Sequence, residues 1–199
     1  MNQFIRVKNK LKRLKRADKT YSVFGAEKHK YKLNAPLKEK AIDRFEKEFN
    51  IRLPEDYRLF LKELGNGGAG PYYGLEPLEN GRYADLHYKD ADDLINPGLS
   101  FPHTDHWNFQ EAEFIPENEE KYFDNKWANG LLRIADYGCG MSLNLVVNGL
   151  AYGNIWVDSR VNDAGIFPDP FFKPNGRLSF LEWYEAWLDQ SMDEASNQY

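Results

Sequence analysis

The chain has 199 residues, of which 15% are aromatic and 29% are charged, so it can bury a sizeable core and keep a solvated surface. It contains no run of about 18 apolar residues and no apolar N-terminal signal segment, which argues against membrane spans and secretory signals. The single Cys139 cannot form an internal disulfide. This pattern is compatible with a reducing compartment, and we therefore expect a cytoplasmic location.

The net charge of −5 is unevenly distributed along the chain. Residues 1–32 carry eleven Lys or Arg against Asp18 and Glu27, about +9, which leaves about −14 on the remainder. An acidic body attracts basic partners and disfavours nucleic acid. A basic nuclease toxin is one protein partner that would fit, and nucleic acid is not expected to bind except through residues 1–32.

The N-terminal residues 1–16 place a few apolar residues among many Lys and Arg, a pattern that fits either a surface helix or an extended arm. Clustered cations are typical of phosphate binding, on nucleic acid or on anionic lipid. A solvated appendage, or one folded back on the acidic body, is the alternative that block charges favour. We predict three parts: a basic extension over residues 1–32, a domain over 33–192 and a polar tail over 193–199.

Two helices are predicted before residue 65. In the segment 36–49 apolar side chains recur every four residues, which gives a helix one buried face. The next helix is expected to begin at Pro54, with a fixed φ suited to a first turn, and to end before Gly65. The glycine-rich turn that follows leads into residues 72–75, an aromatic segment that predicts a short strand.

The C-terminal half predicts a hairpin sheet followed by a helix. Apolar runs of strand length occupy residues 131–136, 142–147 and 150–157, and Asn-Gly at 148–149 is typical of a two-residue hairpin. Residues 158–176 are expected to form a polar loop. Ser179 and Glu182 then form a capping box ahead of an aromatic helix.

Helices at both ends around adjacent strands predict an α+β fold, with one mostly antiparallel sheet and helices packed on one side. Residues 76–129 between them are proline-bearing and acidic, and predict short elements and long loops. Because functional residues often lie on loops that a scaffold holds, this acidic region is a candidate partner surface, against the alternative that it is merely solvated.

Several motifs in order resemble the SUKH superfamily, which includes the fungal Smi/Knr cell-wall regulators and many bacterial immunity proteins. They are Leu-Pro-x-Asp-Tyr at residues 53–57, Asn-Gly-Gly at 66–68, Tyr-Gly-Leu at 73–75, the run 131–147, Gly-Asn-Ile-Trp at 153–156 and Phe-Leu-Glu-Trp at 180–183. The resemblance implies the same α+β fold, and it covers roughly residues 37–189. The family often has an acidic residue directly after the Gly-x-Gly that this chain has at residues 138–140. This chain has Met141 at that position.

Three motifs that could carry chemistry are better explained as structural features. Gly-x-Gly-x-x-Gly at 65–70 follows a helix and leads toward a strand, whereas a dinucleotide loop follows a strand and opens a helix. His-x-Asp-His at 103–106 lacks a fourth metal ligand at a typical spacing. Cys139 joins two predicted strands, unlike a nucleophile elbow. We therefore expect no catalytic residue, cofactor or metal.

The leading hypothesis is a non-enzymatic immunity-type domain that neutralises a cognate toxin by direct binding, with a nuclease as the favoured kind of toxin. The alternatives are a regulatory scaffold of the Smi/Knr type, and a nucleic-acid or anionic-lipid binder that uses residues 1–32. Acidic side chains would steer the partner and exposed aromatic side chains would anchor it. The candidates are Asp85, Asp90, Asp92, Asp93, Glu111 and Glu113 for steering and Tyr72, Tyr73 and Trp107 for anchoring.

Overall fold

The structure of the protein is a computed structural model that describes residues 2–84, 94–109, 116–172 and 177–196. Its centre is an antiparallel sheet of four strands in the order β1-β2-β3-β4. The strands are β1 (Leu131–Gly138), β2 (Met141–Val146), β3 (Ile155–Asp158) and β4 (Ile166–Pro168). The predicted α+β fold is confirmed.

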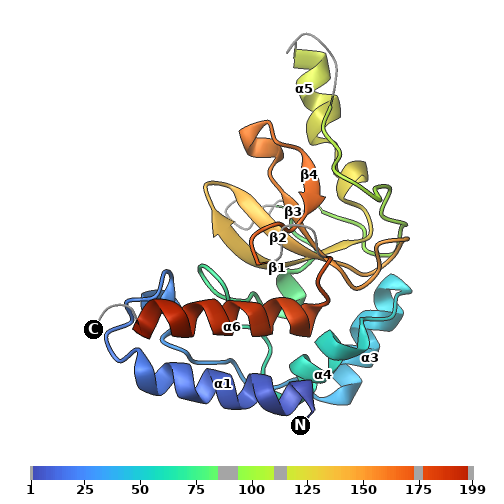
Figure 1. The fold of residues 1–199 in the computed structure, drawn as a ribbon. Coiled ribbons are helices and arrows are strands. Elements are labelled where there is room, and N and C mark those ends of the chain that lie inside the picture. The colour runs from blue at the N-terminus through green and yellow to red at the C-terminus, as the bar shows by residue number, and fades with distance from the viewer. Residues whose placement is uncertain (1, 85–93, 110–115, 173–176, 197–199) are drawn as a thin grey trace.

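Helices cover one face of this sheet. The helix α6 (Phe180–Ser196) lies directly beneath it, and α4 (Glu55–Glu63) packs against α6 (Figure 1). The ring of Phe60 meets Phe180 edge to face at 5.1 Å, and the Tyr184 hydroxyl donates to the Ala69 carbonyl at 2.8 Å. Because aromatic side chains bury large apolar areas, this layer dominates the main core.

The helix α1 (Gln3–Ala17) lies below α6 and runs in the same direction (Figure 1). Val7, Leu11 and Leu14 are buried against the main core, because they recur at spacings of four and three on one face. Residues 3–17 therefore form a packed helix. The division of the chain at residue 32 stays a prediction.

Three further α-helices and three short 3₁₀ helices are present in the described part of the chain. They are α2 (Ala26–His29), α3 (Glu39–Phe49), α5 (Pro116–Phe123) and the short 3₁₀ helices η1 (Leu78–Asn80), η2 (Asn125–Ala128) and η3 (Arg160–Asn162). The helix predicted over residues 36–49 is α3, and the helix predicted from Pro54 is α4, with Pro54 as its N-cap.

The second face of the sheet carries a smaller core, against which loop residues pack. Trp156 is fully buried there, and the ring of Phe101 meets it edge to face at 4.8 Å. This core includes Leu131, Val146 and Ile166 from three other strands, which lie on the same face because side chains alternate along each strand.

Three local predictions were wrong. The two-residue turn at 148–149 does not form: β3 begins only at Ile155, and Leu150 is 90% exposed. The predicted loop 158–176 contains β4. Tyr72 and Tyr73 lie in a turn, and only Leu75 after them forms β-bridges, to Gly68 and Ala135. The predicted capping box at the start of α6 does form one of its bonds, since the Ser179 N–H donates to Glu182 at 2.9 Å.

Candidate functional site

The structure separates the predicted anchor residues into two groups. Tyr72 and Tyr73 lie together beside the main core, whereas Trp107 packs against the smaller core on the opposite face of the sheet. The predicted steering residues lie outside the described residues: Asp85, Asp90, Asp92, Asp93, Glu111 and Glu113.

Tyr72 and Tyr73 belong to a cluster of five rings that we call the aromatic patch. Its members are Phe24, Tyr72, Tyr73, Tyr137 and Phe171. Phe24 meets Tyr73 at 5.4 Å, Tyr72 meets Tyr137 at 4.2 Å, and Tyr137 stacks on Phe171 at 4.7 Å. Phe24 is 58% exposed, Phe171 38% and Tyr73 37%. Three large aromatic side chains thus meet solvent in one place, which on a protein surface typically marks an interaction site.

The backbone beneath the patch is strained and closely packed. Tyr72 has a φ of 53°, in the left-handed region that bulky residues rarely adopt, at a cost of about 1–3 kcal/mol. Gly25 presses on this turn, since a Cβ there would lie 1.6 Å from the Tyr72 carbonyl oxygen. Gly138 similarly leaves room for the Tyr73 ring. Such strain persists only where surrounding contacts over-determine a conformation, so the patch is held rigidly.

A buried carboxyl group holds the Phe171 edge of the patch. The Phe171 N–H donates to Asp169 Oδ1 at 2.9 Å, while Oδ2 has no hydrogen bond of normal geometry. Burial raises the pKa of Asp169 to about 6, an effect that the Phe171 N–H and the nearby Trp183 indole only partly offset. Burial also raises the pKa of Tyr72, and the charge of Asp169 adds to this. Both effects disfavour the charged form of the Tyr72 hydroxyl.

Trp107 is part of a stack that closes the second sheet face. Its ring stacks on Trp127 at 4.7 Å and on His103 at 4.9 Å, and its main-chain N–H donates to the Ile166 carbonyl at 2.8 Å. Because Trp107 is half-buried and held by a β-bridge, its ring serves packing more than solvent contact. Its role as a partner anchor stays a prediction.

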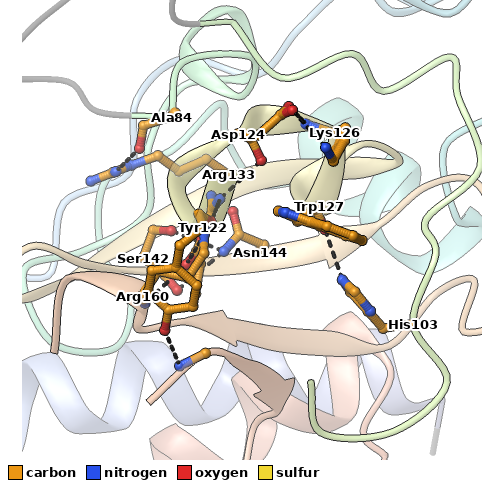
Figure 2. Close-up of polar contacts among 12 residues, drawn as sticks. Ala84, His103, Tyr122, Asp124, Lys126, Trp127, Arg133, Ser142, Asn144 and Arg160 are labelled. Carbon is orange, nitrogen blue, oxygen red and sulfur yellow. Dashed lines mark hydrogen bonds and ion pairs between the residues drawn. The ribbon is translucent and has the colours of Figure 1, made fainter. Parts of the chain in front are cut away.

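A polar network lies beside this stack (Figure 2). Arg160 binds the Asp158 carboxylate at 2.7 Å and donates to the main-chain carbonyls of Tyr122 and Asp124 at 3.2 and 3.1 Å. The Tyr122 hydroxyl in turn accepts from the Gly165 N–H at 3.0 Å. Arg160 is 5% exposed, so its guanidinium ties the segment around α5 and η2 to the sheet.

Two further polar groups of the sheet are buried. Arg133 pairs with Glu76 at 3.0 Å and donates to the Ala84 carbonyl at 2.9 Å. Burial raises the pKa of Glu76, and the Arg133 charge opposes that rise. Asn144 is fully buried and donates to the Ser142 hydroxyl at 2.9 Å (Figure 2). The contacts of Arg160, Arg133 and Asn144 therefore serve to hold the sheet and its neighbouring segments together.

The residues with possible chemistry do not converge in the described part of the chain. His103 and His106 each engage a backbone carbonyl, of Trp127 at 3.1 Å and of Ala164 at 2.8 Å. Cys139 is exposed at the β1–β2 turn with a φ of 52°. Among the described residues there is no group of three or more His, Cys, Asp or Glu placed to hold a metal ion.

Three members of the patch were missed by sequence reasoning: Phe24, Tyr137 and Phe171. They come from segments far apart in the chain, and the fold brings them to Tyr72 and Tyr73. Tyr137 lies near the end of β1. Because side chains alternate along a strand, the pattern of this strand could have assigned Tyr137 to one face of the sheet. Phe24 and Phe171 precede and follow regular elements and carried no periodic pattern.

The structure is an α+β domain that carries a cluster of exposed aromatic side chains. The chain matches the SMI1 / KNR4 family (SUKH-1) over residues 36–168, and it belongs to that family. The match leaves out both α1 and α6. A search of curated proteins and a search of solved structures each found no significant match. None of the described helices is long and apolar enough to cross a membrane.

Proposed function

We propose that this protein is an immunity-type binding domain that neutralises a cognate toxin, with a basic nuclease as the favoured kind, by direct contact. The observation that supports this most is the aromatic patch, in which three exposed rings stand on a strained and closely packed backbone. Rigid aromatic side chains bind at a low entropic cost and dominate the energy of many protein interfaces. Membership of the SUKH-1 family is consistent with a protein partner.

The acidic part of the chain would supply the long-range attraction. Residues 33–199 carry a net charge of about −14, and the acidic residues at 85–93 and 111–113 contribute to this charge. A negative surface raises the association rate of a basic toxin, while aromatic anchors that become buried in the complex slow its dissociation. The toxin would then be neutralised because its active cleft is covered. No bond is made or broken on the immunity protein.

Capture from the native cell tests this proposal. The wild type and a Tyr73→Ala/Phe171→Ala variant serve as baits, with Leu99→Ala/Leu150→Ala as the control. Leu99 and Leu150 are 51% and 90% exposed, and they lie near the end of β2 that is far from Tyr137. We expect the wild type and the control to retain a protein that the patch variant loses, with an affinity difference of about 30-fold or more.

The captured protein is then produced alone. The immunity proposal predicts growth arrest, relieved by co-production of the wild type but not of the patch variant. A captured protein that is harmless alone would favour the alternative, a regulatory scaffold of the Smi/Knr type. Equal capture by the patch variant and the wild type would contradict the assignment of the patch.

A further inference from the structure

The outward side of α1 carries a concentrated positive charge that we call the basic face. It consists of Lys8, Lys12, Lys15 and Arg16 on the helix and Lys32 beside it, all of them exposed. Lys12, Lys15 and Lys32 line one open groove, with a cavity volume of about 360 Å³, between α1 and residues 31–33. The face is therefore continuous from the helix to the neighbouring loop.

The cations of the basic face are not neutralised within the described part of the chain. Two other cations of α1 are paired: Arg6 binds Glu185 at 2.9 Å, and Lys10 binds Asp189 at 2.6 Å. No described carboxylate lies within ion-pair distance of the five cations of the basic face, and residues 3–17 contain no Asp or Glu. The inner edge of α1 is thus balanced by α6, whereas the basic face is not.

Like charges repel along the basic face. Lys12 is four residues from both Lys8 and Arg16, a spacing that brings side chains together on a helix and destabilises it when the charges are alike. The helix α3 differs, because its cations alternate with Glu39, Asp43, Glu46 and Glu48. Packing of Val7, Leu11 and Leu14 keeps α1 helical in spite of the repulsion, and a bound polyanion would relieve it.

The shape of the face favours nucleic acid over a membrane. A helix that lies on a bilayer inserts its apolar side, but the apolar side of α1 is already covered by α6. The cations instead form a row about 12 Å long from Lys8 to Arg16 beside a groove. Such a row matches the axial rise of about three to four base pairs of a duplex.

We propose that the basic face binds the phosphate backbone of a nucleic acid, without reading its sequence. The binding rests on charge alone, because lysine and arginine side chains displace condensed counterions from the phosphates. This site lies on α1, outside the residues that match the family, and is separate from the aromatic patch. It therefore does not depend on the function proposed for the patch.

Fluorescence anisotropy with labelled nucleic acids tests the proposal on the full chain. The probes are a short DNA duplex, an RNA duplex and a single strand, at salt concentrations between about 50 and 200 mM. The test variant is Lys8→Gln/Lys12→Gln/Lys15→Gln/Arg16→Gln. The control variant, Lys38→Gln/Lys40→Gln/Arg44→Gln/Lys47→Gln, removes the same charge on and beside α3. Glutamine is a good helix former, and circular dichroism checks that both variants fold.

We expect the wild type to bind with an affinity that falls steeply with salt. The α1 variant should bind about tenfold or more weakly at low salt, and its salt slope should be smaller by about 3 to 4 for duplex DNA. The α3 control and Tyr73→Ala should bind within about threefold of wild type. The three probes then distinguish the kind of nucleic acid.

Three outcomes would overturn the proposal. The wild type could fail to bind any of the probes at low salt, or the α1 and α3 variants could lose binding equally, which would indicate an effect of net charge alone. Retention on vesicles of phosphatidylserine and phosphatidylcholine without nucleic-acid binding would instead assign the basic face to membranes.

Discussion

Gly25 and Tyr72 meet backbone to backbone: a Cβ on Gly25 would lie 1.6 Å from the Tyr72 carbonyl oxygen. Gly25 also has a φ of 76°, which disfavours any other residue. This contact joins the turn before α2 to the turn that carries Tyr72 and Tyr73. Both turns contribute rings to the aromatic patch, so the contact fixes how those rings lie.

Gly25→Ala should therefore disturb the patch as well as the fold. We expect the free energy of unfolding to fall by about 2 kcal/mol or more, from left-handed strain and from displacement of the Tyr72 turn. Gly153→Ala is the matched control, because Gly153 has a φ of 84° and a Cβ added to it would meet nothing within 4 Å. Equal losses in the two variants, measured by urea denaturation, would show that the close contact contributes nothing.

The ion pairs between α1 and α6 should make stability depend on pH. Hydrogen bonding from Arg6 lowers the pKa of Glu185 to about 2, from an ordinary value of 4.5. Because the folded pKa is lowered, the stabilisation is present above pH 4.5 and is lost as pH falls toward 2. Since solvent around Arg6 screens the pair, Glu185→Gln should reduce the free energy of unfolding by about 1–2 kcal/mol at pH 7 and by little near pH 2. A difference that stays constant with pH would contradict this.

Asp169 should act in the opposite direction. Burial raises its pKa to about 6, so ionisation of the folded protein costs stability as pH rises from the ordinary pKa of 3.8 through 6. The free energy of unfolding of Asp169→Asn, relative to that of wild type, should rise by about 2–3 kcal/mol between pH 4 and pH 7.5. Thermal unfolding of both proteins across this range measures the effect, and parallel pH profiles would argue against a buried, ionising carboxyl group.

The acidic residues proposed to steer the partner should affect association more than dissociation. Asp90→Asn/Asp92→Asn/Asp93→Asn should lower the association rate constant for a captured basic partner and weaken its salt dependence. The rate at which the partner dissociates from this variant should change little, whereas Tyr73→Ala should raise the dissociation rate. Surface plasmon resonance at two salt concentrations separates the effects. An unchanged association rate would remove the steering role.

Regular elements with strong local patterns could be predicted from the sequence. The helix α4 follows from Pro54 and from its apolar spacing, and β1 and β2 follow from apolar runs. The strand β4 escaped prediction because it has only three residues and ends in Pro168, and it depends on pairing with β3. The long turn before β3 escaped prediction because Asn148 and Gly149 pair with Phe101, a long-range contact, and do not close a two-residue hairpin.

The candidate site was only partly predictable. Tyr72 and Tyr73 stood out because they follow a glycine cluster, but their neighbours depend on long-range packing. Phe24 reaches them through the contact at Gly25, and Phe171 through the bond to Asp169. Likewise, the α1 sequence allowed a helix or an arm. Its place was decided by packing of Val7, Leu11 and Leu14 into the main core. Ion pairs to Glu185 and Asp189, about 180 residues away, add to this.

Binding of a protein partner by the aromatic patch is tested most directly by a dissociation constant. The captured partner is titrated against three proteins: wild type, Tyr73→Ala/Phe171→Ala and Leu99→Ala/Leu150→Ala. We predict that the patch variant binds at least about 30-fold more weakly while the control matches wild type. Equal affinities for wild type and the patch variant, with both proteins folded, would contradict a contact role for the patch.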